Sequence, residues 1–286
     1  MRFAVLGPGG VGGLLAALLS RGGDHVVVLH DSAPREIQVE SKRFGDFTAE
    51  VSVAPRLAEP VDAVLVTVKA TQLDDALRRV PASVLGDALV IPLLNGIEHV
   101  TRLRSVYGAS VKPATIAVES TRVSPGLIRQ TSPFAVIQMT GPQPVADRFK
   151  AAGFDVRVRD DELAMLWDKM AALAPMALLT THERANVGEM RARRREDLEA
   201  VLREFAAVAA AEGVVIDPVA NLAFIDRAPA SMETSMQRDQ AAGRPTEIDA
   251  LGGALLRRAA KAGIEVPVTT RLVHELESRP VTSTPA

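Results

Sequence analysis

The stretch that decides the fold is residues 2–12, which read RFAVLGPGGVG from Arg2 to Gly12. An apolar run with strand composition leads into a glycine-rich turn, and helix-forming residues follow the turn at 13–19. Gly7 permits a tight turn, Gly9 lets a pyrophosphate approach the backbone, and Gly12 lets the new helix pack closely on the strand. The free N–H groups and positive end of that helix would face the phosphates. The predicted dinucleotide-binding loop consists of Gly7, Pro8, Gly9, Gly10, Val11 and Gly12.

A second apolar strand, predicted at residues 26–29, follows at the distance that such a site requires and leads into His30 and Asp31. An acidic residue at this point usually binds the free ribose hydroxyls of NAD. Ser32 and Arg35 follow closely, and they could instead hold the 2′-phosphate of NADP. The residues alone leave both cofactors open.

Composition limits the classes of function. The chain has 286 residues, a formal net charge of -2, 3% aromatic residues and no cysteine. Disulfides and thiolate metal sites are excluded, no metal site is predicted, and neither nucleic acid nor an anionic membrane is an expected partner. No apolar run approaches the roughly 20 residues of a membrane span, and no signal peptide is visible, so a cytoplasmic location is expected.

The first half of the chain alternates strand-like and helix-like segments, which favours a parallel sheet. Ser124-Pro125-Gly126 lies between two further strand-like stretches and predicts a hairpin, which suggests an antiparallel edge to that sheet. The expected strands cover residues 61–68, 88–94, 114–123 and 127–139, and the expected helices cover 73–80 and 97–107.

The pattern becomes almost wholly helical from Asp160 onward. We therefore predict a Rossmann-type dinucleotide-binding domain at residues 1–159 and an all-α substrate or catalytic domain at 160–286. Pro175 should interrupt and kink the first helix, and the tail at 280–286 should be disordered. Later helices are expected at 196–211, at 248–262 with Gly263 closing it, and near 269–278.

A hydride-transfer enzyme also needs a proton donor and groups that orient the substrate. Lys169 lies in the sequence LWDKM, and Leu173 and Ala177 share its helical face. Desolvation on such a face would lower the pKa of the lysine and let it donate a proton near neutral pH. From spacing alone, a lysine that extends from a helix edge into water is the favoured interpretation.

Two other polar residues have alternative interpretations. Asn95 follows the strand at 88–94, so it could bind a carboxamide or a substrate hydroxyl, although Asn-Gly after a strand is often only a turn. Glu247 opens a helix, where an acidic residue is common for electrostatic reasons. Nothing local separates a functional from a structural role for either residue.

Taken together, the chain resembles the ketopantoate reductase (2-dehydropantoate 2-reductase) family over nearly its whole length. The matching pieces, in order, are Gly7-x-Gly9-x-x-Gly12, VKATQ at 68–72, LNG at 94–96, LWDKM at 166–170, TSM at 234–236, TEID at 246–249 and LLRRA at 255–259. The resemblance implies a C-terminal helical domain like that of 6-phosphogluconate dehydrogenase. It also implies reduction of a 2-oxo acid to a 2-hydroxy acid with NADPH.

The resemblance assigns roles to individual residues. Lys169 matches the catalytic lysine that protonates the new alkoxide, and Glu247 matches the glutamate on the substrate hydroxyl side. Ser235 matches a serine at the substrate carboxylate, and Asn95 matches an asparagine near both nicotinamide and substrate. Lys69, with Gln72 in the same motif, is implied to line the cofactor cleft.

The chain departs from the family pattern at two places. The family usually places asparagines on and just after the lysine's helical face, whereas this chain has Leu173, Ala177 and Val187, with Asn186 one position away. Asp31 stands where the family often has an arginine for the 2′-phosphate. The family's habit favours NADP(H), and Asp31 keeps NAD(H) open.

These observations predict an NADP-dependent 2-dehydropantoate 2-reductase that serves pantothenate biosynthesis. One alternative keeps the fold and Lys169 but takes a more apolar 2-oxo acid, because a site without those asparagines loses hydrogen-bonding partners for substrate hydroxyls. A non-catalytic dinucleotide-binding sensor is a third interpretation, and the presence of both Lys169 and Glu247 argues against it. A homodimer formed through the helical half is a possible assembly.

Overall fold

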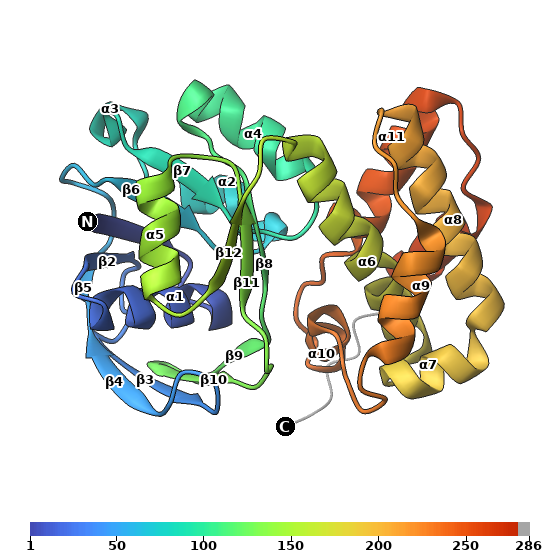
Figure 1. Ribbon diagram of the computed structural model, residues 1–286, viewed down its shortest axis with the longest axis horizontal. Helices are drawn as coiled ribbons and strands as arrows, with labels where there is room; N and C mark the ends of the chain where they lie inside the picture. The colour runs from blue at the N-terminus through green and yellow to red at the C-terminus, as the bar shows by residue number, and fades with distance from the viewer. Residues whose placement is uncertain (280–286) are drawn as a thin grey trace. The chain divides into compact units, whose positions relative to one another are not determined.

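A computed structural model describes residues 1–279, and the chain divides into two compact units (Figure 1). The first unit contains Met1–Leu94 and His99–Met165, and the second contains Asn95–Glu98 and the chain from Leu166 onward. The sequence puts the change of domain after residue 159, shortly before this division. The tail at 280–286, expected to be disordered, lies outside the described residues.

The first unit is built on a five-stranded sheet in which every strand runs parallel, in the order β5-β2-β1-β6-β7. Its central strand β1 is buried on both faces, as near-continuous apolar runs in parallel sheets are. The chain winds outward from β1 in both directions, so the carboxyl ends of β1, β2 and β6 border the crevice where such sheets bind ligands. The strands are β1 (Arg2–Leu6), β2 (His25–Leu29), β5 (Ser52–Ala54), β6 (Ala63–Val66) and β7 (Leu89–Pro92).

Helix α1 (Gly10–Arg21) lies between this sheet and a second one, whose strand order is β4-β3-β10-β9 (Figure 1). The helix is apolar around most of its circumference, so both of its sides need cover. Gly13 permits close packing, because a Cβ there would lie 2.6 Å from Cδ1 of Ile128 in the second sheet. This sheet consists of β3 (Glu36–Ser41), β4 (Phe47–Glu50), β9 (Ser120–Ser124) and β10 (Leu127–Gln130).

The predicted hairpin around Ser124-Pro125-Gly126 is confirmed, since β9 and β10 pair antiparallel. Its expected place was wrong. The pair belongs to the second sheet rather than to an edge of the parallel sheet, because the outer side of α1 needs an apolar cover. Strands β3 and β4 were not predicted, although the alternating burial of Glu36–Ser41 follows its alternating polar and apolar residues.

A third sheet, in the order β12-β11-β8, completes the first unit with helix α5 (Gln143–Ala151) against β12. Each of the two long strands expected at 114–123 and 127–139 is therefore split between two sheets. Pro133 falls in the second break, where a residue without an N–H cannot continue a ladder. The strands are β8 (Ala114–Ala117), β11 (Val136–Met139) and β12 (Asp155–Val158). The unit also holds η1 (Ala70–Gln72), α2 (Leu73–Leu77), α3 (Ala82–Leu85), α4 (Glu98–Tyr107, begun in the second unit) and η2 (Gly108–Ser110).

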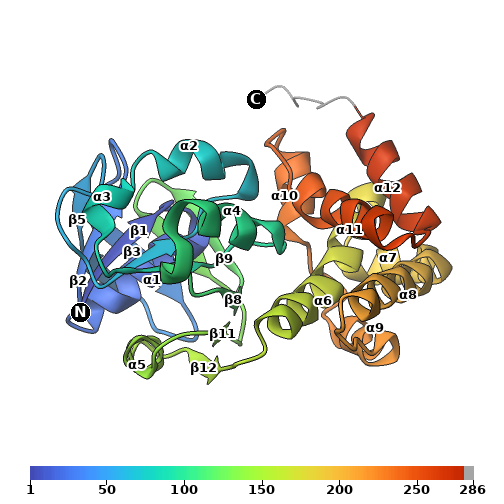
Figure 2. The same ribbon diagram turned by 90° about the horizontal axis from the view of Figure 1, so that it is seen from above.

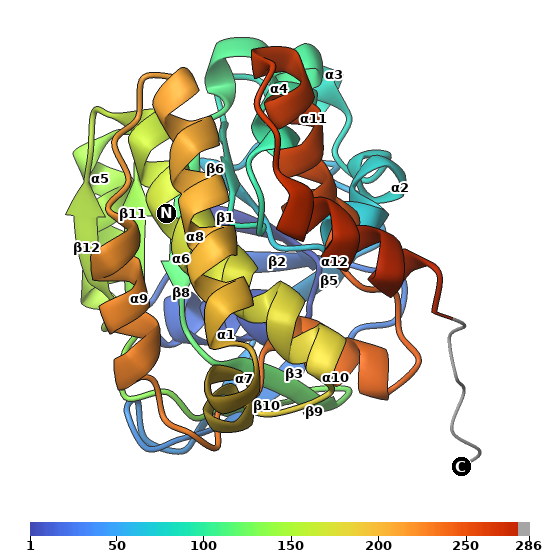
Figure 3. The same cartoon turned by 90° about the vertical axis from the view of Figure 1, so that its right-hand side faces the viewer.

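From Leu166 to Arg279, every regular element that the structure describes is helical, as predicted. Helix α8 contacts α7, α9, α11 and α12, and Figures 2 and 3 show it among them. The helices are α6 (Glu162–Glu183), α7 (Val187–Arg193), α8 (Arg195–Ala211), α9 (Pro218–Arg227), α10 (Ser235–Ala241), α11 (Ala254–Ala262) and α12 (Pro267–Glu277).

Helix α6 corrects two expectations. It continues without interruption through Pro175, where Ala174 and Met176 are buried, because packing of the helix can outweigh the single hydrogen bond that a proline removes. It is also long and apolar enough to cross a membrane by length and composition, whereas no such run was expected. The buried share of that apolar stretch is 67%, a property of core helices that pass the same test. The first turn of α6 stays with the first unit, where Glu162 accepts hydrogen bonds of 2.7 and 2.6 Å from Arg104.

The helix expected at 248–262 begins with a π-helical turn, Asp249–Gly253, before α11 continues it. Gly252 explains the local packing, because a Cβ there would lie 2.4 Å from Cγ2 of Val273 in α12 and 3.2 Å from Cδ2 of Leu178 in α6. Gly263 closes α11 with a φ of +67°. The irregular turn begins two residues after Glu247, and π-turns occur frequently at functional sites.

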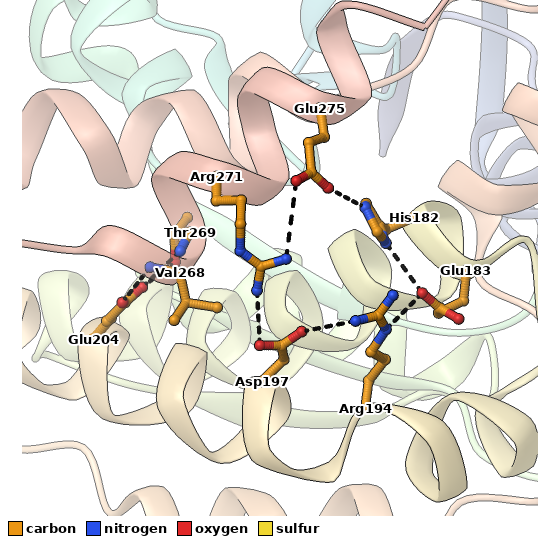
Figure 4. A network of polar contacts seen from close by, with 9 residues as sticks. All are labelled: His182, Glu183, Arg194, Asp197, Glu204, Val268, Thr269, Arg271 and Glu275. Carbon is orange, nitrogen blue, oxygen red and sulfur yellow. Dashed lines mark hydrogen bonds and ion pairs between the residues drawn. The ribbon is translucent and has the colours of Figure 1, made fainter.

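A network of charged side chains joins α6, α8 and α12 (Figure 4). The buried carboxylate of Glu204 caps α12 by accepting from the backbone N–H groups of Val268 and Thr269, both at 2.8 Å. Farther along the same helices, Arg271 of α12 donates to Asp197 of α8 at 2.8 Å, and His182 of α6 contacts Glu275 of α12 at 2.5 Å. These contacts fix the three helices in register around an apolar core.

Candidate functional site

The glycine loop after β1 meets three different steric demands. Gly7 has a φ of +103°, and a Cβ on Gly12 would lie 2.1 Å from the Gly7 carbonyl oxygen and 2.3 Å from Oγ1 of Thr67. A Cβ on Gly9, in contrast, would meet no atom within 4 Å. Gly9 is also the N-cap of α1 and has no side chain to accept from the first N–H groups of the helix. The loop therefore combines a tight turn, close helix packing and an open space in front of free N–H groups.

Two residues that the sequence did not indicate, Thr67 and Ser120, donate hydrogen bonds to the backbone of this loop. Thr67 donates to the carbonyl oxygens of Leu6 and Gly7, at 3.0 and 2.8 Å, and so joins the end of β6 to the end of β1. Ser120 of β9 donates to the Gly10 carbonyl at 2.8 Å, and a Cβ on Gly10 would lie 2.1 Å from the Ser120 carbonyl oxygen. Only the unexpected second sheet brings Ser120 here, so no local signal could have identified it.

At the carboxyl end of β2, Asp31 forms a bidentate ion pair with Arg79. Arg79 donates to Oδ1 at 2.9 Å and to Oδ2 at 2.5 Å. These hydrogen bonds lower the pKa of the Asp31 carboxyl below its ordinary value. Ser32 and Arg35 are exposed, and the Ser32 N–H donates to Nδ1 of His30 at 3.1 Å. Arg79 is a third residue that the sequence did not indicate.

Lys69 and Gln72 follow β6 at the same edge of the sheet. Lys69 is half-buried and is the N-cap of the short helix η1, while Gln72 is exposed at the end of that helix. The edge therefore carries the glycine loop, Asp31 and this pair at the ends of three neighbouring strands, as the sequence predicts. The cofactor-binding roles of these residues remain predictions.

In the second unit, Asn95 donates through Nδ2 to Oε2 of Glu247 at 3.0 Å. Glu247 is buried, and Asn95 is half-buried. The two residues are 152 positions apart, so the contact gives each a partner that no local pattern could show. The interpretation of Asn95-Gly96 as only a turn is therefore incomplete.

The segment Asn95–Glu98 follows a strand of the parallel sheet but packs with the helical unit. Gly96 has a φ of +82°, and a Cβ there would lie 2.5 Å from the carbonyl oxygen of Ala250 in the π-turn. Arg257 joins the same two segments by donating to Glu98 Oε2 at 2.6 Å and to Asp249 Oδ1 at 2.6 Å. Three contacts thus hold Asn95 beside Glu247.

Lys169 lies on α6 and is half-buried. Burial lowers the pKa of its ammonium to about 8, and the nearby carboxylate of Glu247 opposes part of this shift. Two residues earlier, Trp167 donates to Glu212 Oε2 at 2.9 Å, and Arg258 holds the same carboxylate at 2.5 Å. The helix that carries Lys169 is therefore anchored, and the unit places a proton donor, a carboxylate and an amide in one region.

Ser235 is the exposed first residue of α10, and its neighbour Thr234 is buried. The Thr234 hydroxyl accepts from the Gln237 N–H at 3.3 Å and lies 2.9 Å from Oγ1 of Thr180 in α6. The TSM motif is thus fixed to the helix that carries Lys169. The role of Ser235 toward a substrate carboxylate remains a prediction.

The positions where the family usually has asparagines carry apolar side chains that are wholly or partly buried. Ala177 and Val187 are buried, and Leu173 is half-buried. Asn186 does not replace them, because its side-chain oxygen caps α7 by accepting from the Glu189 N–H at 2.9 Å. This part of the site offers fewer hydrogen bonds than the family pattern.

Comparison with known proteins covers both halves of the chain. The family model described as "Ketopantoate reductase PanE/ApbA" matches residues 3–140, and "Ketopantoate reductase PanE/ApbA C terminal" matches residues 161–279. A 2-dehydropantoate 2-reductase of Caulobacter vibrioides is 32% identical over 96% of this chain and 98% of its own. The chain therefore belongs to the ketopantoate reductase family, a family of oxidoreductases.

Solved structures agree on the fold. A PanE/ApbA family ketopantoate reductase from Ralstonia eutropha JMP134 superposes with a TM-score of 0.88 at 27% identity, over 97% of each chain. A D-mandelate dehydrogenase solved with NADH and anilino(oxo)acetate has a TM-score of 0.87 at 21% identity, over 97% of this chain and 98% of its own. The second likeness concerns the fold alone, a Rossmann-type domain followed by a helical domain.

Proposed function

We propose that this member of the ketopantoate reductase family reduces 2-dehydropantoate to pantoate in the cytoplasm, as a step of pantothenate biosynthesis. The observation that carries the proposal is the grouping of Lys169, Glu247 and Asn95 in the helical unit. A lysine whose pKa is about 8 can donate a proton near neutral pH, which is what reduction of a ketone requires.

The glycine loop, Lys69 and Gln72 fit a nicotinamide dinucleotide, because Gly9 leaves space before the free N–H groups of α1. A nicotinamide dinucleotide held there would supply the hydride that reduces the keto carbon. Lys169 donates a hydrogen bond to the keto oxygen and transfers its proton there as negative charge develops. Glu247 keeps the ammonium charged and receives a hydrogen bond from Asn95, while Ser235 contacts the substrate carboxylate.

NADPH is the proposed reductant. Asp31 occupies the position beside the ribose, but its charge is balanced by the guanidinium of Arg79. Arg35, which is exposed, supplies a further positive charge close along the chain. Together they make the end of β2 compatible with a 2′-phosphate.

The direct test follows absorbance at 340 nm with ketopantoate, run in parallel with NADPH and NADH. Rapid oxidation of NADPH, with slower oxidation of NADH, is expected. Absence of oxidation of both, with dinucleotide binding shown separately, would contradict the proposed reaction.

A more apolar 2-oxo acid is the second candidate substrate. The buried Ala177 and Val187 favour it, since both stand where the family usually offers asparagines. A polar substrate group that meets no partner there loses binding energy. Relative kcat/KM values for ketopantoate and for 2-oxo acids with purely aliphatic side chains decide between the two substrates.

The pH dependence of the reaction follows from Lys169. Because the proton donor must be charged, kcat/KM should fall as the pH rises above about 8, the pKa of Lys169. In Glu247→Gln, loss of the neighbouring carboxylate lowers the pKa of Lys169 further, so the falling limb should move to lower pH. Glu233→Gln, which removes an exposed carboxylate of the same unit, serves as the control. A limb that stays in place in Glu247→Gln would contradict the coupling.

We also propose that the protein forms a homodimer through its helical half. Three large apolar side chains on α9 and in the segment before it are exposed, Val215 at 91%, Val219 at 71% and Phe224 at 52%. A second copy of the chain that packed on α9 would bury these side chains. Sedimentation equilibrium is expected to give twice the mass of one chain, and Val219→Asp with Phe224→Asp is expected to give a monomer.

A further inference from the structure

We propose that Arg79 is a specificity-determining residue of the cofactor site, which neutralises Asp31 and thereby lets the site accept a 2′-phosphate. This inference rests on the proposed use of a nicotinamide dinucleotide and names the residue that selects between its two forms. Arg79 lies between α2 and α3, far from the glycine loop in sequence.

The backbone and side chain of Arg79 are both anchored. Its N–H donates to the Ala76 carbonyl at 2.9 Å, and its carbonyl accepts from the Leu57 N–H at 2.7 Å. Its guanidinium also donates to the Pro55 carbonyl at 2.6 Å, just beyond strand β5. The end of helix α2 and the segment that follows β5 therefore hold the guanidinium beside the end of β2.

The pair with Asp31 is bidentate and faces solvent. Two parallel hydrogen bonds join the two side chains, the arrangement in which guanidinium and carboxylate bind most strongly. The side chain of Asp31 is 67% exposed and that of Arg79 is 30% exposed. A ligand at the end of β2 therefore meets the pair rather than a lone carboxylate.

The charge of this pair decides what the position accepts. A ribose 2′-phosphate carries up to two negative charges, so an unpaired carboxylate beside it would repel it. A guanidinium within hydrogen-bonding distance cancels that repulsion, while the carboxylate keeps lone pairs for ribose hydroxyls. The pair thus tolerates both nucleotides, and removal of Arg79 should penalise only the phosphorylated one.

The test measures nucleotide binding directly, by isothermal titration of the full chain with 2′,5′-ADP and with 5′-AMP. The wild-type protein should bind 2′,5′-ADP more tightly. In Arg79→Gln, the Kd for 2′,5′-ADP should rise about tenfold, while the Kd for 5′-AMP should stay within about twofold. The double variant Arg79→Gln with Asp31→Asn removes both charges and should recover most of the loss.

Arg78→Gln is the matched control. Arg78 is the preceding residue, its side chain is 83% exposed, and its ion-pair partner is Asp75 rather than Asp31. It should leave both dissociation constants unchanged. If Arg79→Gln fails to fold, Asp31→Asn alone keeps the idea testable, since an unbalanced guanidinium should tighten 2′,5′-ADP severalfold.

Three results would overturn the inference: equal weakening of both nucleotides in Arg79→Gln, no change in either, or tighter wild-type binding of 5′-AMP. Failure of the proposed function looks different. In that case Arg79→Gln would still weaken binding of 2′,5′-ADP but not of 5′-AMP, and the wild-type protein would reduce no 2-oxo acid.

Discussion

Lys169→Ala is expected to lower kcat by about 10²-fold or more, since a positioned general acid typically contributes 10²–10⁴-fold. The reason is specific to this site. The ammonium of Lys169 is partly desolvated and lies near Glu247, so water cannot readily replace it as a donor of matched pKa. Single-turnover measurement with saturating dinucleotide separates this chemical step from product release.

Two controls accompany this variant. Dinucleotide affinity should remain near the wild-type value, because the glycine loop belongs to the other unit. Lys169→Arg keeps the positive charge but not a donor that titrates near neutral pH, so it should recover substrate binding without full turnover. Wild-type kcat in Lys169→Ala would remove this residue from the mechanism.

The second large effect is expected at the glycine loop, where two alanine substitutions should act differently. In Gly9→Ala, the new methyl group meets no protein atom within 4 Å, so the thermal midpoint should stay unchanged. On the proposed function, the same methyl group would occupy the space through which a pyrophosphate would approach the backbone. Dinucleotide Kd should therefore rise by more than about tenfold, a loss of about 1.4 kcal/mol.

In Gly12→Ala, the new methyl group would lie 2.1 Å from the Gly7 carbonyl oxygen and 2.3 Å from Oγ1 of Thr67. Overpacking of this kind costs about 1–3 kcal/mol, so the thermal midpoint should fall by several degrees. Scanning calorimetry without nucleotide measures the thermal midpoint of each variant. Titration calorimetry measures the dinucleotide Kd of each variant. Equal destabilisation by both variants would contradict the separate roles of the two glycines.

The sequence predicted those features that depend on neighbouring residues. The glycine loop, the parallel strands and the helical second half follow from local spacing and composition, and the structure confirms this order of elements. The hairpin turn at Ser124-Pro125-Gly126 was also visible. The sheet to which it belongs was not, because that depends on α1 needing cover on both sides.

The contacts that complete the site depend on distant residues. Asn95 and Glu247 are 152 positions apart, and Arg79 and Asp31 are 48 apart, so no local pattern could pair them. Asp31 alone kept NAD(H) open, whereas we propose that its pairing with Arg79 admits the 2′-phosphate of NADP(H). The π-turn likewise brings Gly252 close to α6 and α12, a long-range contact that helical periodicity does not reveal.

The segment Asn95–Glu98 has a consequence for recombining proteins of this family. Although it continues directly from β7, its partners are Glu247, Ala250 and Arg257 of the helical unit. A chimera joined at residue 160 would inherit this loop from one parent and its partners from the other. To exchange substrate preference between relatives, a chimera should therefore take residues 95–98 from the same parent as the helical half, although they lie within the N-terminal part of the sequence.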